Sequence, residues 1–166
     1  MKKRITLERT YDAPLEDVWE MWTTKEGIES WWGPDGFRVE VSQIDLRPGG
    51  ELHYTMIAVG AEQIAFMQKA GMSVRVNNLN RFTEITPLKR LAYTSLVDFV
   101  PGKSAYDVET VVELEKTKQG VRLVLTFDAM HDSHWTQMAT MGWENELGKL
   151  DQALASASRG RGDERR

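Results

Sequence analysis

The segment at residues 131–134 carries the residue types of both a metal site and a hydrolytic triad. It reads His131-Asp132-Ser133-His134, and His53 is a candidate third nitrogen ligand. Helical metal ligands usually sit at i and i+4, whereas these two histidines are three positions apart at an expected helix start. Residues adjacent in sequence rarely supply the geometry of a triad. We therefore expect helix capping and solvent exposure here, and we assign neither a catalytic residue nor a metal ligand.

Carboxylates elsewhere in the chain give little support for catalysis. Glu109, Glu113 and Glu115 alternate along one expected strand, which places them together on its solvated face. Glu84 and Asp98 lie near expected strand ends and are candidates for acid–base chemistry, although no pattern around them indicates a shifted pKa. The sequence therefore favours a binding protein over an enzyme.

Composition sets limits on the class of protein. The chain has 166 residues, 21 basic and 25 acidic side chains, and no cysteine, so disulfides and thiol chemistry are excluded. The net charge of -4 does not provide the basic surface that nucleic-acid binding needs. No apolar run approaches the roughly 18 residues of a membrane span. We expect a cytoplasmic protein with no nucleic-acid partner and no membrane insertion.

The length suits one domain. No linker, repeat or low-complexity segment divides residues 1–157, which we interpret as a single domain. Residues 158–166 are rich in Arg and Gly and are expected to form a disordered tail.

Hydrophobic periodicity predicts the elements that must position any site. Alternation of apolar and polar residues predicts strands, and a 3.6-residue period predicts helices. A β-bulge is expected near Ser42-Gln43, where the inward parity changes, and Arg47-Pro48-Gly49-Gly50 has the composition of a tight turn. The expected order is a strand at 4–10, helices from about 14 and at 25–31, strands at 37–46 and 51–56, a helix at 61–70, and strands at 72–86, 90–99, 108–115 and 121–127. Asp12 is a candidate cap of the first helix.

The last element is an amphipathic helix from Ser133 to about Ala155. Its inward stripe contains Trp143, Leu147 and Leu150, so we expect Trp143 to be buried. A run of strands followed by a long helix indicates an α+β protein, in which an antiparallel sheet curls around that helix.

Four ordered motifs resemble one protein family. They are Ala13-Pro14 with Val18-Trp19, then Trp31-Trp32-Gly33-Pro34, then Asp45-Leu46-Arg47-Pro48-Gly49-Gly50, and finally Gly142-Trp143 with Leu147 and Leu150. Together they resemble the homologues of the activator of heat-shock-chaperone ATPase (AHSA-like), in the START-like or SRPBCC superfamily. The resemblance covers about residues 4–155 and implies the helix-grip fold, with a cavity between the curved sheet and the last helix. Because that superfamily includes carriers, cyclases and chaperone regulators, the fold does not set the activity.

The resemblance also implies which residues line the cavity. Flexible Met side chains suit an adaptable apolar pocket, and inward polar groups such as Tyr54 and Tyr93 either pair with one another through water or orient a ligand. The candidate ligand-binding residues are Trp32, Tyr54, Met56, Phe66, Met67, Met72, Tyr93, Thr110, Trp135, Met138 and Met141.

Three functions remain open from the sequence. The first is a binding module for a small apolar or amphipathic ligand, without a cofactor. The second is an interaction module for a chaperone or another chain, with a homodimer as a further alternative. The third is a cyclase-like or hydrolytic enzyme that uses the same cavity. Gly60 and Gly71 flank the expected helix at 61–70, which suggests a lid whose Phe66 and Met67 cover the ligand; a fixed structural helix is the alternative.

Overall fold

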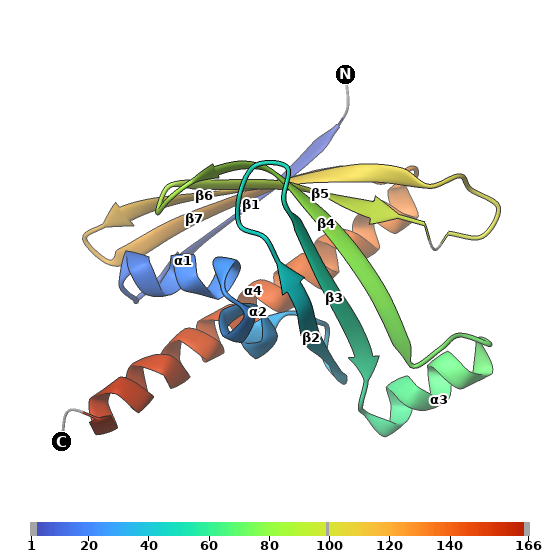
Figure 1. Ribbon diagram of the computed structural model, residues 1–166, viewed down its shortest axis with the longest axis horizontal. Helices are drawn as coiled ribbons and strands as arrows, with labels where there is room; N and C mark the ends of the chain where they lie inside the picture. The colour runs from blue at the N-terminus through green and yellow to red at the C-terminus, as the bar shows by residue number, and fades with distance from the viewer. Residues whose placement is uncertain (1–2, 99, 165–166) are drawn as a thin grey trace.

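A curved, seven-stranded antiparallel sheet holds α4 against one face, together with α1 and α2 (Figure 1). The structure, a computed structural model, describes residues 3–98 and 100–164. The strands follow the order β1-β7-β6-β5-β4-β3-β2, and α4 crosses the concave face. The elements are β1 Arg4–Tyr11, α1 Leu15–Thr23, α2 Lys25–Trp31, β2 Phe37–Ile44, β3 Glu51–Ala58, α3 Ala61–Lys69, β4 Arg75–Thr86, β5 Arg90–Val97, β6 Tyr106–Thr117, β7 Gly120–Asp128 and α4 Ser133–Glu164. The α+β helix-grip fold expected from the sequence is confirmed.

Local sequence signals account for the turns. The register between β2 and β3 shifts between Val41 and Gln43, which confirms the expected bulge. Gly49 has a φ of 85°, a left-handed conformation that favours glycine in the turn between these strands. The expected cap of α1 is wrong, because the helix begins after Pro14 and no side chain, including that of Asp12, caps it.

The long helix α4 is anchored at its start and at its middle. Asp132 Oδ1 accepts a hydrogen bond from Trp135 N, so the expected cap is confirmed. The buried Tyr11 hydroxyl of β1 donates to the Leu147 carbonyl at 2.8 Å. The helix continues to Glu164 rather than ending near Ala155, because helix propagation adds one hydrogen bond for each residue that is fixed. The backbone of residues 158–164 is therefore helical where disorder was expected, and Arg165 and Arg166 lie outside the described residues.

One end of the concave face is closely packed. Leu123 and Leu125 of β7 are fully buried, as are Val18 of α1 and Leu150 of α4. Trp143 was expected to be buried too, but it is only partly buried and stacks on Trp22, with ring centroids 6.0 Å apart. Trp143 lies where the packed end gives way to a more polar region. Among the described residues, no helix is long and apolar enough to cross a membrane.

Candidate functional site

The concave face carries polar side chains on its central strands, opposite α4. Tyr93 of β5 pairs across the sheet with Thr110 of β6, and Asn80 of β4 pairs with Ser95 of β5. Tyr93, Thr110 and Asn80 are each at most 3% exposed. Buried polar groups are costly unless they are hydrogen-bonded, so the partners of these side chains decide whether they stabilise the sheet–helix interface or destabilise it.

Trp32 places an aromatic ring against this polar region. The residue follows α2, where Thr24 caps the helix start by accepting a hydrogen bond from Gly27 N at 2.9 Å. The Trp32 ring centroid lies 5.2 Å from that of Tyr54 and 6.3 Å from that of Tyr93. Three aromatic rings from a loop and two strands therefore gather on the inner side of the sheet.

Glu146 of α4 supplies a carboxylate to the same region. Its Oε1 accepts a hydrogen bond from Gly33 N at 3.1 Å, and Lys149 Nζ donates to the Gly33 carbonyl. Gly33, the residue after Trp32, is thus held by α4 through both its N–H and its carbonyl. We call the group formed by Trp32, Tyr54, Asn80, Tyr93, Thr110 and Glu146 the inner polar cluster.

The pKa values within the inner polar cluster are strongly shifted. Burial raises the pKa of Glu146 from 4.5 to about 7, although the Gly33 N–H and the Lys149 charge both act to lower it. Burial also raises the pKa of Tyr54 and of Tyr93, and the nearby Glu146 charge adds to both shifts. At neutral pH the two phenols are therefore neutral, whereas Glu146 is close to half-ionised.

Hydrogen bonding within the inner polar cluster is incomplete. The Tyr54 hydroxyl interacts with the Asn80 side chain, and the Tyr93 hydroxyl interacts with Thr110. The buried atoms Trp32 Nε1 and Asn80 Oδ1 have no hydrogen-bond partner. Each unpaired buried group costs about 1–3 kcal/mol. The cluster therefore retains one donor and one acceptor that a bound molecule or water can satisfy.

The structure separates the eleven predicted ligand-binding residues into three groups. Trp32, Tyr54, Tyr93 and Thr110 meet in the inner polar cluster, and Met56 shares the strand face of Tyr54 and is partly buried. Met67 is buried at α3, beside Phe66 and Met72, which are 68% and 46% exposed. On α4, Trp135 is partly buried, whereas Met138 and Met141 are 54% and 61% exposed. Phe66, Met72, Met138 and Met141 thus lie on the surface rather than inside the cluster.

Two residues of the cluster escaped the sequence-based selection. Glu146 lies three positions after Trp143 and one before Leu147, so helical spacing alone places it near the inward stripe. Asn80 lies two positions before the buried Phe82 on β4, so strand alternation places it on the inner face. In both cases the signal was a polar residue at a position where the spacing of the helix or strand predicts an inward-facing apolar side chain.

The histidine-rich segment forms a different arrangement. His131 Nδ1 lies 2.7 Å from the Tyr106 hydroxyl, and its Nε2 lies 3.5 Å from Asp132 Oδ2. Ser133 begins α4, and no hydrogen bond joins it to His131 in the described part of the chain. Residues 3–98 and 100–164 contain no group of three His, Asp or Glu side chains placed to hold a metal ion.

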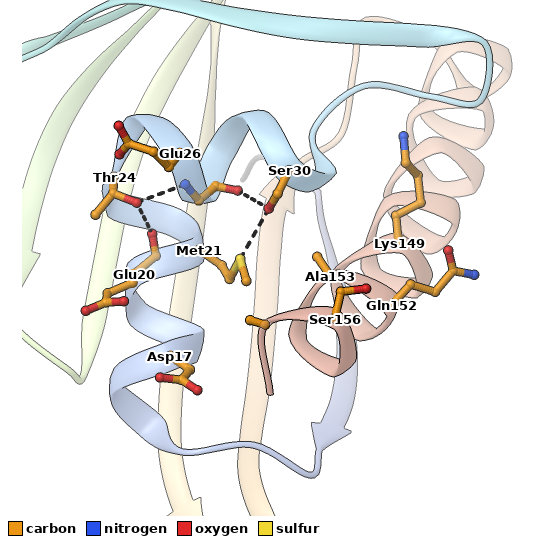
Figure 2. A pocket seen from close by; sticks show the side chains of 12 residues that line it. Asp17, Glu20, Met21, Thr24, Glu26, Ser30, Lys149, Gln152, Ala153 and Ser156 are labelled. Carbon is orange, nitrogen blue, oxygen red and sulfur yellow. Dashed lines mark hydrogen bonds between the residues drawn. The ribbon is translucent and has the colours of Figure 1, made fainter. Parts of the chain in front are cut away.

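A groove with a volume of ≈ 620 Å³ lies between α1, α2 and the second half of α4 (Figure 2). Its rim includes Asp17, Glu20 and Glu26, and its polar groups make local bonds, such as that from Ser30 Oγ to the Gly27 carbonyl at 2.6 Å. None of the unpartnered buried polar atoms of the described residues belongs to a side chain that lines this groove. The groove is therefore a weaker candidate than the inner polar cluster.

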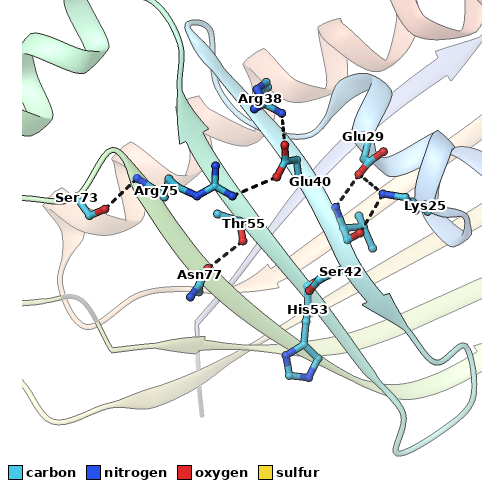
Figure 3. Close-up of polar contacts among 11 residues, drawn as sticks. Lys25, Glu29, Arg38, Glu40, Ser42, His53, Thr55, Ser73, Arg75 and Asn77 are labelled. Carbon is cyan, nitrogen blue, oxygen red and sulfur yellow. Dashed lines mark hydrogen bonds and ion pairs between the residues drawn. The ribbon is translucent and has the colours of Figure 1, made fainter.

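The outer face of β2, β3 and β4 carries a network of ion pairs (Figure 3). Hydrogen bonds from Arg38 and Arg75 lower the pKa of Glu40, which lies between them. Lys25 and Glu29 join α2 to β2, since Glu29 Oε2 accepts from Lys25 Nζ and from Val41 N, each at 2.7 Å. Exposed pairs of this kind contribute at most about 1 kcal/mol each. The network ties elements together and is satisfied within itself.

Solved structures with the same fold come from several bacteria. A protein from Chromobacterium violaceum has a TM-score of 0.75 and 23% identity, over 91% of this chain and 96% of its own. One from Nitrosomonas europaea has a TM-score of 0.70 and 26% identity, over 94% and 96% of the two chains. An AHSA1-like protein from Aeromonas hydrophila has a TM-score of 0.73 and 21% identity, over 94% of each chain.

A search among curated proteins gave no significant match. The sequence model of the family described as "Activator of Hsp90 ATPase homolog 1-like protein" matches residues 12–155, which include every member of the inner polar cluster. The family and its fold support a ligand-binding or interaction module in general. The chain therefore belongs to the Activator of Hsp90 ATPase homolog 1-like family, with the START-like fold that the sequence motifs indicated.

Proposed function

We propose that this protein binds a small amphipathic molecule between the concave sheet face and α4, at the inner polar cluster. The observation that carries the proposal is the pair of unpartnered buried atoms, Trp32 Nε1 and Asn80 Oδ1. A fold that needed these residues only for packing would gain stability by replacing them with apolar side chains. A ligand that donates to one atom and accepts from the other accounts for their presence.

The surroundings suit the apolar part of such a molecule. The rings of Trp32, Tyr54 and Tyr93 offer aromatic surface, and Met56 adds a flexible side chain beside Tyr54. Ligand sites typically combine mostly apolar walls with a few polar groups that fix orientation. The remaining predicted residues, on α3 and on the first half of α4, stay candidates for the entrance.

A matched pair of substitutions tests the location. Ser95 shares the inner face with Asn80 and is partly exposed, whereas the next residue, Thr94, points to the outer face. The neutral dye N-phenylnaphthylamine, followed by its fluorescence, should bind the wild type and the Thr94→Trp variant. Ser95→Trp should weaken binding at least about tenfold, because its ring fills the space beside Asn80.

Melting curves of both variants control for unfolding. Native mass spectrometry of protein purified from its own host should in addition show a retained small molecule. Equal dye binding by the two folded Trp variants would contradict the proposed location. Absence of dye binding by the wild type would contradict the proposed function itself.

The pKa of Glu146 supports a second candidate function, acid–base catalysis in the same place. A carboxyl group that titrates at about 7 can both give and take a proton at neutral pH. Under this alternative, Glu146→Gln should retain an unreacted substrate that native mass spectrometry detects, whereas the wild type should carry its product or nothing. The same molecule on both proteins would favour binding without reaction.

An interaction with a chaperone or with a second copy of the chain is a third candidate. The exposed apolar side chains Phe66, Met138 and Met141 favour it, because large exposed apolar groups are a feature of interaction surfaces. Size-exclusion chromatography with light scattering tests for a dimer. A mass above that of one chain, lost in Met138→Ser/Met141→Ser, would support this candidate.

A further inference from the structure

The inner polar cluster has an excess of hydrogen-bond acceptors. Glu146 presents two carboxylate oxygens, and the only hydrogen bond to it from the described residues comes from Gly33 N. Asn80 Oδ1 is a further acceptor without a partner. On the donor side, Trp32 Nε1–H has no partner among the described residues, and the Tyr54 phenol adds one O–H group that Asn80 Oδ1 does not accept. A complementary ligand must therefore supply more donors than acceptors at this point.

The charges around Glu146 also favour a ligand that supplies hydrogen-bond donors. Lys149 is the one basic side chain that affects the Glu146 carboxyl, but its ammonium is directed to the Gly33 carbonyl, and its side chain also lines the groove between α1, α2 and α4 (Figure 2). The other titratable groups near Glu146 are the Tyr54 and Tyr93 phenols, which are neutral. Among the side chains that the structure describes, the carboxylate therefore meets no cation on the side of the tyrosines.

The aromatic rings favour a cation as well. The Trp32 ring packs edge-to-face against that of Tyr54, with centroids 5.2 Å apart, and its centroid lies 6.3 Å from that of Tyr93. The faces of Trp and Tyr rings attract cations, and aromatic cages recognise ammonium groups in this way. A neutral or anionic head group would gain apolar contact but no cation–π attraction from these rings, and it would leave the carboxylate uncompensated.

From this arrangement we infer that the ligand carries a protonated amine, bound between Glu146, Asn80 Oδ1 and the rings of Trp32, Tyr54 and Tyr93, with an apolar body along the sheet. The inference rests on the proposed function and narrows it to one chemical class. The ammonium N–H groups donate to Glu146 and to Asn80 Oδ1, which satisfies both acceptors at once. Trp32 Nε1–H then takes an oxygen of the ligand or a water molecule.

Three probes that share one ring system test the ligand class. Naphthylethylamine, naphthylethanol and naphthylacetate have a cationic, a neutral and an anionic head group, and calorimetric titration gives their affinities. At about pH 8.5 the amine should bind the wild type at least about tenfold more tightly than the alcohol, the effect expected of a hydrogen bond to a charged partner. The acetate should bind most weakly.

Two variants of α4 provide the matched comparison. Glu146→Gln keeps the shape and an oxygen for Gly33 N but removes the charge, so the preference for the amine should fall at least about fivefold, to the part that the rings and Asn80 supply. Glu144→Gln removes the same charge from an exposed position two residues away and should keep the preference. A preference for the amine that is undiminished in Glu146→Gln would overturn the inference.

The wild type alone gives an independent measurement. Alkyl amines stay protonated up to about pH 10, whereas Glu146 gains a proton as the pH falls through about 7. The preference for the amine should therefore shrink about tenfold between about pH 8.5 and about pH 5.5, while alcohol binding stays constant.

The outcomes distinguish the two levels of the proposal. Equal binding of amine and alcohol by the wild type, or a preference that does not change with pH, would overturn the amine class and leave the proposed ligand site in place. If none of the three probes nor N-phenylnaphthylamine binds, the proposed function fails, and the amine class fails with it.

Discussion

The two ends of the concave face differ in the polarity of their inward-facing side chains. Beneath α1 and the second half of α4, the inward residues of β7 are Val121, Leu123, Leu125 and Phe127, each at most 1% exposed. Toward β3, β4 and β5 the same face carries Tyr54, Asn80 and Tyr93. One end is mainly an apolar core, whereas the other gathers buried polar side chains, and its Trp32 Nε1 and Asn80 Oδ1 lack partners. Among the described residues, Trp22 Nε1 and Thr117 Oγ1, outside the inner polar cluster, are unpartnered as well.

This contrast separates stability from function. Burial of aliphatic surface is the main favourable contribution to folding, and the packed end provides it. Unpaired polar atoms oppose folding, so the polar end makes the fold less stable than an apolar sequence would. Because α4 crosses both ends, one helix joins the part that stabilises the fold to the part for which we propose binding (Figure 1).

The largest effect is expected at the packed end. Leu150 of α4 is fully buried against the core. Leu150→Ala should lower the free energy of unfolding by about 2–5 kcal/mol, because it removes buried methyl groups and leaves a cavity. Denaturant melts measure the loss, and Gln152→Ala, at an exposed position of the same helix, is the control. A loss below about 1 kcal/mol would mean that this end is not the main source of stability.

The next largest effect is the pH dependence of the free energy of unfolding that Glu146 causes at the polar end. The pKa of Glu146 is about 7 in the folded protein and 4.5 as an ordinary carboxyl, so the folded state binds the proton more tightly. The resulting stability is complete below pH 4.5 and is lost as the pH rises toward 7. Because Glu146 keeps partial solvent exposure, we expect a loss of roughly 2 kcal/mol rather than the full value of the shift.

Glu146→Gln should remove this dependence. Denaturant melts at about pH 5 and about pH 8 should show the variant gaining roughly 2 kcal/mol relative to the wild type at the higher pH. Glu144→Gln should follow the wild type at both values. Parallel pH profiles for Glu146→Gln and the wild type would show that the Glu146 carboxyl is well solvated and that the polar end is open to water.

The packed end was predictable from the sequence because apolar residues at strand and helix spacing have one stable place, the core. That rule gave Val121, Leu123 and Leu125 on one strand and Leu147 and Leu150 on the helix. The change of inward parity after Val41 gave the bulge, and the resemblance to the family implied the helix-grip connectivity. Turn and cap positions were less certain, since Asp12 and Asp132 have the same capping chemistry and only Asp132 caps a helix.

The polar end was predictable only in part. Tyr54, Tyr93 and Thr110 share apolar strand faces, so alternation located them. Glu146 depends on the rotation of α4 relative to the sheet and on contact with Gly33, which lies 113 positions away in the chain. Spacing along one helix cannot supply that contact. The exposure of Met138 and Met141 depends on the same rotation of α4, which spacing along the helix does not determine.

A smaller effect on stability is expected at Asn80, with a larger effect on binding. Asn80→Leu removes the unpartnered Oδ1 but also the interaction with Tyr54, so the two effects oppose each other. The free energy of unfolding should change by less than about 1 kcal/mol, whereas the affinity for naphthylethylamine should fall about tenfold. Asn77→Leu, on the outer face of the same strand, is the control for both measurements. Unchanged amine affinity would remove Asn80 from the proposed site.

The smallest effect is expected at α3, a third region of the molecule. Substitutions there test whether this helix takes part in ligand exchange. α3 lies beyond the ends of β3 and β4 (Figure 1), with Met67 buried and Phe66 exposed. Phe66→Ala should therefore change stability by less than about 0.5 kcal/mol, whereas Met67→Ala should cost about 2 kcal/mol or more. Because the Phe66 ring is directed to solvent, the release rate of N-phenylnaphthylamine, measured by stopped-flow fluorescence, should not change in Phe66→Ala. Faster release without a change in melting temperature would show that α3 closes over the bound ligand, as the glycines at both of its ends suggested, and that Phe66 acts as part of a lid.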